Sequence, residues 1–183
     1  MATPDPLDEA VERMLAGDEG AFRTVYREVQ PPLLRYLGVL VGTTDAEDVA
    51  SEAWSQAFRD LDRFTGDADG FRGWITTIAR NRALDHLRRV SRRPVSDRTL
   101  DDLVDLRDDT DVELDTLGRV SSEAALRLIA ALPRDQAEAI MLRTVLGFDA
   151  PTAARILGKR PGAVRAASHR GLKQLAKKIS EEP

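Results

Sequence analysis

The chain has 183 residues, of which 42% are hydrophobic and 5% aromatic, and its net charge is −4. It contains no cysteine, which excludes disulfides, thiolate metal sites and a cysteine nucleophile and favours a reducing, cytoplasmic compartment. No apolar run approaches the roughly 18 residues of a membrane span, and residues 1–8 lack the pattern of a secretory signal.

The first part of the chain predicts helices and no strands. Residues 7–16 form a short amphipathic stretch, and a helix over 21–30 is expected to stop at Pro31-Pro32, where another helix begins. Gly42 is placed to end that helix, and residues 43–45 offer a cap for the next. In that next helix the apolar residues share one face: Ala46, Val49, Ala50, Ala53, Trp54, Ala57, Phe58 and Leu61.

A loop over residues 64–70 precedes a predicted helix over 71–89 that is rich in arginine. Phe71, Ile75 and Ile78 are spaced to face a core. Trp74 has two interpretations: an aromatic at helical spacing is usually a core residue, but an aromatic beside arginines can also stack on an unpaired base. We predict a core position for Phe71 and leave Trp74 open between the two.

The second part of the chain predicts four helices after an acidic linker. The expected helices are one starting near Ser121 and ending at Pro133, one over 137–146, a short one over 149–157 and a long one over 161–179. The last two are separated by a tight turn at Gly158. The apolar face expected for the long helix consists of Val164, Ser168, Leu172, Leu175 and Ile179.

Charge is sorted along the chain in three blocks. Residues 72–93 contain seven arginines and one acid, residues 97–115 contain nine acids and two arginines, and residues 155–178 contain eight basic residues and no acid. Solvated helix faces usually mix both signs, so two basic blocks separated by an acidic one favour contact with phosphate. The order short helix, glycine turn, long basic helix is also typical of the helix-turn-helix, whose second helix enters the major groove.

Catalytic patterns are missing from the sequence. His86 and His169 lie on different predicted helices, and there is no HExxH spacing, nucleophile elbow or glycine-rich phosphate loop. We therefore predict that the protein is not an enzyme and uses no metal ion and no cofactor. His169 is interpreted as a DNA contact and His86 as packing or solvent-facing.

Several stretches resemble a known family. Residues 45–52 (DAEDVASE) and 71–89 (FRGWITTIARNRALDHLRR) look like conserved region 2 of extracytoplasmic-function (ECF) sigma factors, members of the sigma-70 family of bacterial RNA polymerase. Residues 132–136 (LPRDQ), followed by Gly158 and the basic helix, look like region 4. The resemblance covers about residues 7–178. It implies an all-α fold of two small helical domains, region 2 over 7–92 and the helix-turn-helix region 4 over 121–183, joined by a flexible acidic linker over 93–120.

By this resemblance, the protein binds core RNA polymerase and directs promoter-specific initiation in the cytoplasm, under control of an anti-sigma factor and without a membrane anchor. The residues implied for the β′ coiled-coil of the polymerase are Asp45, Glu47, Asp48 and Glu52. Those implied for melting and reading the minus-ten element are Trp74, Arg80, Asn81, Asp85, Arg88 and Arg89. Those implied for the minus-thirty-five element are Arg160, Arg165, His169, Arg170 and Lys173. The acidic linker is expected to run through the polymerase cleft.

The chain departs from the family pattern at three positions. Ser51 stands where glutamine is usual, Ala167 where a long polar or basic side chain is usual, and Ser168 where an apolar one is common. The upstream promoter sequence therefore cannot be transferred from relatives. Two other functions fit parts of the sequence: a stand-alone helix-turn-helix regulator, and a module that sequesters a partner through its acidic helix, although the latter leaves both basic blocks unexplained.

Overall fold

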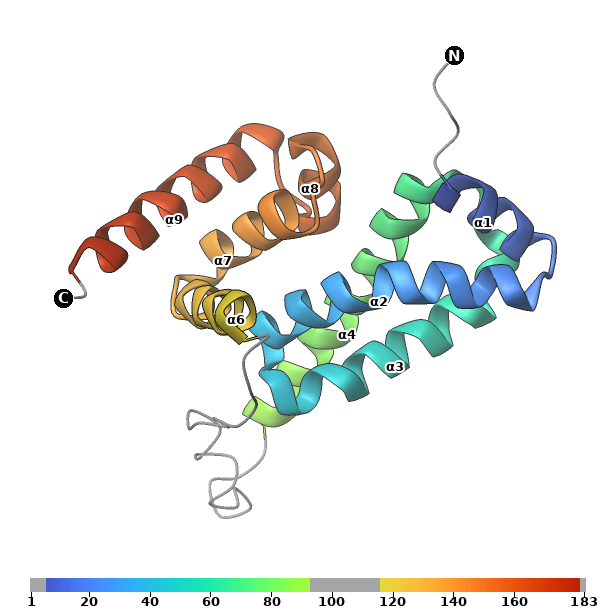
Figure 1. The fold of residues 1–183 in the computed structure, drawn as a ribbon, viewed down its shortest axis with the longest axis horizontal. Helices are drawn as coiled ribbons and strands as arrows, with labels where there is room; N and C mark the ends of the chain where they lie inside the picture. The colour runs from blue at the N-terminus through green and yellow to red at the C-terminus, as the bar shows by residue number, and fades with distance from the viewer. Residues whose placement is uncertain (1–5, 93–115, 182–183) are drawn as a thin grey trace.

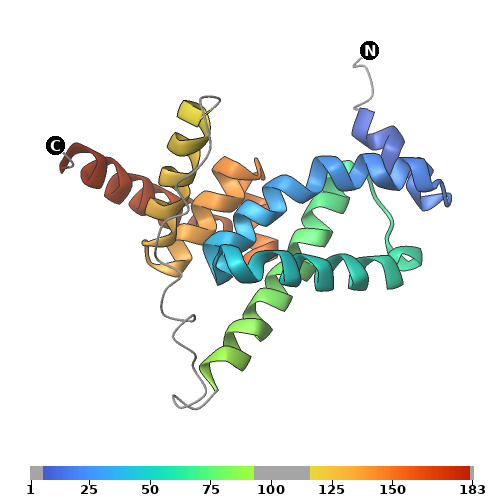
Figure 2. The ribbon, with the colours of Figure 1, turned by 60° about the horizontal axis from the view of Figure 1, so that its bottom comes forward.

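The computed structural model describes residues 6–92 and 116–181, and all regular elements in these ranges are helical (Figures 1 and 2). The first bundle consists of α1 (Pro6–Leu15), α2 (Glu19–Val41), α3 (Thr43–Arg59), the 3₁₀ turn η1 (Leu61–Arg63) and α4 (Ala68–Ser91). The second bundle consists of α6 (Thr116–Ala130), α7 (Arg134–Ile140), the π-helical turn η3 (Met141–Val145), α8 (Ala150–Leu157) and α9 (Pro161–Glu181). The all-α prediction is confirmed. The acidic segment interpreted as a linker lies, up to residue 115, outside the described residues.

The core of the first bundle lies where α2, α3 and α4 meet. Figures 1 and 2 show α2 and α3 side by side and antiparallel, with α4 crossing them. Its largest fully buried side chains include Leu33, Tyr36, Phe71 and Ile75. Burial of each large apolar side chain is worth about 1.5–3 kcal/mol, which is what holds these helices together. The predicted core position of Phe71 is confirmed.

The predicted stop at Pro31-Pro32 is wrong, because α2 runs through both prolines as one helix of 23 residues. A proline inside a helix removes a hydrogen bond and crowds the carbonyl four residues earlier, at a cost of about 3 kcal/mol. Buried residues lie on both sides of the prolines, with Val25 and Val29 before them and Leu33 after them. Packing along the whole length of α2 therefore outweighs the local preference for a break.

One glycine serves both α2 and α3. Gly42 ends α2 with a φ of 87°, and it is also the residue that precedes the first turn of α3. The predicted role of Gly42 at the end of α2 is confirmed. The predicted side-chain cap from residues 43–45 is wrong, because Thr43 is already helical and Gly42 supplies no side chain.

The helix-turn-helix pattern of the second bundle is confirmed. The Asp149 side chain accepts a hydrogen bond of 2.8 Å from the Thr152 N–H and so caps α8. Gly158 ends α8 in the left-handed conformation (φ 63°), which a glycine adopts without a steric penalty, and α9 starts three residues later. At the crossing of α7 and α9, a Cβ built on Gly171 would lie only 2.6 Å from Ile140 Cδ1.

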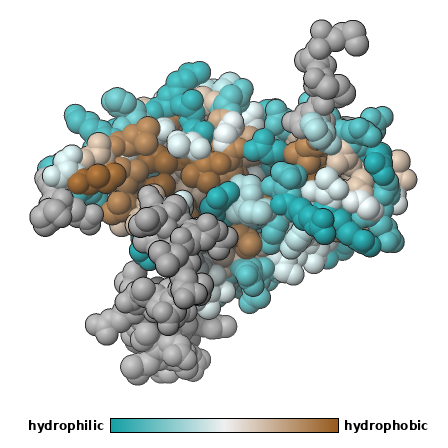
Figure 3. Space-filling model, in the orientation of Figure 1, coloured by the Kyte–Doolittle hydropathy of each residue, from teal (hydrophilic) through white to brown (hydrophobic). Residues whose placement is uncertain are grey.

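Two predicted apolar faces extend beyond the core. Phe58 is 66% exposed at the last turn of α3, where its ring packs edge-on with that of Phe22 (centroids 5.9 Å apart, planes at 82°). Leu172 and Ile179 are also exposed, because the C-terminal half of α9 extends past α7 and α8 (Figure 1). Hydrophobic surface gathers on this side of the second bundle (Figure 3).

Candidate nucleic-acid interface

The acidic residues predicted to contact the polymerase lie at the start and along the outer face of α3. Glu47, Asp48 and Glu52 are exposed there. Asp45 is partly covered, because one of its carboxylate oxygens lies 2.8 Å from His86 Nε2 on α4. A second link joins the same two helices, where Glu52 lies 3.6 Å from the guanidinium of Arg89. Two of the four acids, Asp45 and Glu52, are therefore linked to α4.

The C-terminal half of α4 presents most of the residues predicted to read the minus-ten element. Asn81, Asp85, Arg88 and Arg89 are all exposed. Within this set Asp85 Oδ1 and Arg88 Nη1 form an ion pair at 3.0 Å, which partly neutralises the arginine. This half of α4 is therefore an exposed surface on which Asp85 and Glu52 offset part of the charge of Arg88 and Arg89.

Trp74 lies in an aromatic cluster at the N-terminal half of α4. Its ring centroid is 5.1 Å from that of Phe64 and 5.8 Å from that of Phe71. Unlike Phe71, Trp74 is only partly buried, and it lines a hollow of about 640 Å³ between α4 and the second bundle, with Phe148 and Thr152 on the opposite side. One part of the indole thus belongs to the core and another part faces an accessible space.

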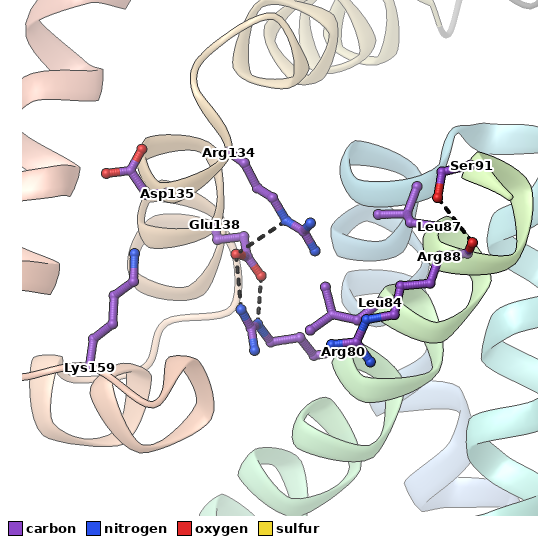
Figure 4. A pocket seen from close by; sticks show the side chains of 9 residues that line it. All are labelled: Arg80, Leu84, Leu87, Arg88, Ser91, Arg134, Asp135, Glu138 and Lys159. Atoms are coloured by element: carbon purple, nitrogen blue, oxygen red, sulfur yellow. Dashed lines mark hydrogen bonds and ion pairs between the residues drawn. The ribbon is translucent and has the colours of Figure 1, made fainter.

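Arg80 is a predicted site residue that is paired with the second bundle. Its Nε and Nη2 donate hydrogen bonds of 2.7 and 3.2 Å to the two carboxylate oxygens of Glu138 on α7 (Figure 4). The Tyr36 hydroxyl donates a third, at 3.1 Å, to the same carboxylate. The side chain of Glu138 is only 4% exposed and that of Arg80 16%. Burial disfavours the charged guanidinium, but hydrogen bonding and charge from Glu138 outweigh it and hold the pKa of Arg80 above its ordinary value.

Arg72 makes a second contact between the bundles. Its guanidinium donates a hydrogen bond to the backbone carbonyl of Leu146 and lies 5.3 Å from the centre of the Phe148 ring, a cation–π distance. Both ends of the α4 face that carries Arg72 and Arg80 therefore contact the second bundle.

The second bundle presents the residues predicted for the minus-thirty-five element on α9 and the turn before it. Arg160, Arg165, His169 and Lys173 are exposed, and the last three recur every four residues on one face of α9. Arg170 is also exposed and lies 3.7 Å from Asp135 on α7. All five residues are therefore on the surface of the helix-turn-helix.

Ala167 and Ser168 lie on the inner face of α9. They are only 3% and 4% exposed, so their side chains pack against the second bundle. The departure from the family pattern at these positions therefore changes packing, whereas the exposed positions of α9 keep their polar and basic side chains.

Sequence reasoning did not identify Glu138 as a site residue. His86, interpreted from the sequence as packing or solvent-facing, is partly buried and contacts Asp45 between α4 and α3. A signal for Glu138 was present, because it is a single acid among Ala137, Ala139 and Ile140, and a lone charge on an apolar face requires a partner. The identity of the partner, an arginine 58 residues away, was not encoded in any local pattern.

The described residues also bear on metal binding and on membrane insertion. Over 6–92 and 116–181 no three histidine or acidic side chains come close enough together to hold a metal ion. Within the same ranges no helix combines the length and the apolar character needed to cross a membrane.

Family comparisons match both bundles in order. The family model described as Sigma-70 region 2 matches residues 25–93, and the one described as Sigma-70, region 4 matches residues 122–175. The first covers α3 and α4 with their exposed acids and arginines, and the second covers the helix-turn-helix.

Curated relatives match along nearly the whole chain. The ECF RNA polymerase sigma factor ShbA of Streptomyces griseus is 32% identical over 173 residues, which are 90% of this chain and 91% of that protein. The ECF RNA polymerase sigma factor BldN of Streptomyces coelicolor is 31% identical over 95% of this chain and 66% of its own length. The solved sigma factor RpoE of Bartonella quintana, in complex with the anti-sigma factor NepR, shares the fold (TM-score 0.70, 22% identity, 88% of this chain and 98% of that chain).

Proposed function

The chain belongs to the extracytoplasmic-function sigma factors of the sigma-70 family, and we propose that it binds core RNA polymerase and directs it to specific promoters. The observation that carries this proposal is the order of surfaces on the two matched regions. An exposed acidic face on α3 and an exposed basic half of α4 are followed by a helix-turn-helix with a basic outer face. The protein itself catalyses no reaction in this scheme and acts in the cytoplasm with the polymerase.

The acidic face of α3 is the proposed docking surface for the coiled-coil of the polymerase β′ subunit. Glu47, Asp48 and Glu52 are the exposed acids that a basic partner could pair with, since rim charges of this kind steer and orient association. Asp45 supports this surface through its contact with His86.

The minus-ten element is the proposed target of α4. Opening the duplex costs a few kcal/mol per flipped base, which stacking and backbone contacts must offset. Trp74 offers an aromatic face beside a hollow, and the other proposed contacts to the opened strand are Arg80, Asn81, Asp85, Arg88 and Arg89, of which the arginines can pair with phosphates.

The minus-thirty-five element is the proposed target of α9 and the turn before it. Arginine can contact guanine edges bidentately in the major groove, and lysine can pair with phosphates. Arg165, His169 and Lys173 lie on the outer face of α9 for this purpose, with Arg160 and Arg170 beside them.

The remaining parts of the proposal concern organisation and control. We place region 2 over residues 7–92, an acidic linker that follows the polymerase cleft over 93–120, and region 4 over 121–183. We also propose control by an anti-sigma factor, in keeping with the RpoE–NepR complex, in which a protein of the same fold is bound to such a partner.

In vitro transcription with purified core polymerase tests this function. We expect transcripts from a subset of genomic promoters only when the protein and core polymerase are both present. Tight binding to duplex promoter DNA by the protein alone, with no transcription on adding core polymerase, would instead identify a stand-alone regulator.

Single substitutions then separate the two DNA contacts. Arg165→Ala should lower affinity for the upstream element by about 1–3 kcal/mol, with loss of preference at one base pair, if the arginine contacts a base. Trp74→Ala should slow strand opening more than initial binding, measured at a temperature where the variant is folded, because loss of the contacts with Phe64 and Phe71 should also lower the unfolding midpoint. An equal loss on all DNA sequences for Arg165→Ala would assign that residue to phosphate.

A further inference from the structure

One stripe of α4 faces the second bundle. Arg72, Thr76 and Arg80 recur every four residues and so lie on the same side of the helix. Arg72 contacts the Leu146 carbonyl at one end of the stripe, and Arg80 contacts Glu138 at the other. This stripe lies on the helix to which the proposed function assigns the opened DNA strand.

The carboxylate of Glu138 is satisfied mainly by the first bundle. Its hydrogen-bond donors Arg80 and Tyr36 belong to α4 and α2 of the first bundle. Among the described residues of its own bundle, Arg134 forms an ion pair with it at the longer distance of 3.7 Å. A buried carboxylate without partners is strongly unfavourable, so Glu138 favours the packed arrangement of the bundles. Burial, with the charge of Glu138, also raises the pKa of Tyr36 well above its ordinary value, which keeps its hydroxyl protonated as a donor.

Two hollows lie along the contact between the bundles. One hollow of about 640 Å³ borders Arg80 and Glu138 and is lined also by Leu84, Leu87 and Lys159 (Figure 4). The second, of about 640 Å³, lies beside Trp74 and Phe148. The polar contacts are one part of this interface, because buried apolar residues of both bundles form one continuous core and α2 also packs against α6, α7 and η3. Opening the bundles therefore breaks apolar contacts as well, and the Arg80–Glu138 pair adds a specific polar contribution to their packing.

A guanidinium accepts a carboxylate or a phosphate in the same two-pronged geometry. Arg80 Nε and Nη2 are both committed to the oxygens of Glu138. A DNA phosphate can therefore reach these two donors only by displacing Glu138.

We propose that Glu138 occupies Arg80 in place of a DNA phosphate, so that in the free protein region 4 withholds the Arg72–Arg80 face of α4 from single-stranded DNA. This inference rests on the proposed function for the DNA role of α4. It makes Glu138 an intramolecular competitor of DNA for Arg80. The contact between the bundles has to open before the Arg72–Arg80 face of α4 can bind a DNA strand. The affinity of the free protein is then reduced by the fraction of molecules that are open.

The test uses the full-length chain and two neutral variants of the contact. Glu138→Gln keeps the volume of the side chain but removes its charge, and Tyr36→Phe removes one donor without changing the net charge. Glu123→Gln, at an exposed position on α6, controls for the loss of one negative charge. Because the chain has no cysteine, Glu12→Cys and Gln174→Cys, both at exposed positions, can be labelled in each background for energy transfer between the bundles.

The measurements are the distance between labels and the anisotropy of a fluorescent, random-sequence 12-nucleotide single strand. We expect Glu138→Gln to lengthen the distance and raise strand affinity on the order of tenfold over Glu123→Gln, with a smaller rise for Tyr36→Phe. If the distance lengthens and affinity does not rise, Glu138 does not withhold Arg80. If neither changes, the pair does not hold the bundles together, and both results overturn the proposal. Should Glu138→Gln fail to fold, Tyr36→Phe decides alone.

Failure here is distinguishable from failure of the proposed function. Promoter-specific transcription by the wild-type protein, together with unchanged strand affinity in both variants, would retain the sigma function and remove the competitor. Absence of transcription with core polymerase would instead contradict the function itself.

Discussion

His86 Nε2 lies 2.8 Å from a carboxylate oxygen of Asp45, which joins the C-terminal half of α4 to the first turn of α3. The side chain of His86 is 20% exposed and that of Asp45 43%, so the contact is only partly open to solvent. Four acids were predicted for the polymerase surface as one set, but Asp45 is partly buried against His86, whereas Glu47, Asp48 and Glu52 are exposed. The main effect of the contact is expected on the packing of α3 against α4.

The first prediction compares Asp45 with Asp48. Asp45→Ala should lower the free energy of unfolding on the order of 1 kcal/mol, because it leaves His86 without its partner, and His86→Ala should have a similar, non-additive effect. Asp48→Ala, at an exposed position, should leave stability unchanged and weaken binding to core polymerase. Urea unfolding and a polymerase binding assay measure both quantities. A purely polymerase-binding defect for Asp45→Ala would contradict this assignment.

The second prediction concerns Gly171. Alanine usually stabilises a helix interior relative to glycine by about 1 kcal/mol. At Gly171, however, the added Cβ would meet Ile140 Cδ1 at 2.6 Å and Gln136 Cβ at 3.2 Å, and such overpacking costs about 1–3 kcal/mol. We therefore expect Gly171→Ala to lower the thermal midpoint.

Gly162 is the matched control in the same helix. A Cβ there meets nothing within 4 Å, so Gly162→Ala should leave the midpoint unchanged or raise it. Adding Ile140→Val to Gly171→Ala removes the methyl group that clashes and should recover part of the loss. Equal midpoints for the two glycine variants would show that α7 and α9 adapt without strain.

The third prediction separates Ala166 from Ala167. Ala167 is 3% exposed, so Ala167→Arg would bury a long charged side chain without a partner and should destabilise the second bundle by several kcal/mol, about the loss typical of a broken core. Ala166 is exposed, and Ala166→Arg should retain stability and increase affinity for duplex DNA with a steeper salt dependence. A stable Ala167→Arg variant with altered base preference would place that position in the groove.

The fourth prediction is a pH dependence at the start of α8. The hydrogen bond from the Thr152 N–H holds the pKa of the Asp149 carboxyl below its usual range. The charged cap therefore stabilises the fold above the unfolded-state pKa of about 3.9, and this contribution is lost as the pH falls through the lower folded-state pKa. Asn is also a good cap but does not titrate, so Asp149→Asn isolates the charge.

Urea midpoints at a series of pH values check this dependence. We expect Asp149→Ala to be less stable than wild type at neutral pH, with the difference shrinking in acid. The difference between Asp149→Asn and Asp149→Ala should persist across the same pH range. A wild-type advantage that grows on acidification would contradict the assigned sign.

Local patterns were sufficient for most of the second bundle. Asp149, Gly158 and Pro161 mark helix ends through capping, left-handed backbone and a fixed φ, and each of these effects acts within a few residues. The break expected at Pro31-Pro32 was wrong because helix continuity there is not decided locally. There the deciding energy comes from buried contacts with other helices, which no window of sequence around the prolines contains.

The same contrast between local sequence effects and contacts with distant helices decides which residues of the candidate site were predictable. The exposed side chains of α3 and α9 follow from helical periodicity, because polar residues opposite an apolar face point to solvent. Arg80 obeys that pattern as well, yet it is covered by a glutamate from a different bundle. Its pairing depends on how the two bundles pack, and the local indication was an acid, Glu138, between Ala137 and Ala139 in α7.

The length of α4 has a consequence for cooperativity. This one helix of 24 residues, about 36 Å long at 1.5 Å per residue, carries Arg72 and Arg80 toward region 4 and His86 and Arg89 toward the acids of α3. If polymerase binding shifts the protein toward the form in which the bundles are separated, thermodynamic linkage requires that this separated form bind polymerase more tightly by the same factor. Weakening the Arg80–Glu138 pair should then raise the affinity of the protein for polymerase, although the pair does not touch the acids of α3. The two bundles would form a reciprocal switch with a measurable coupling free energy.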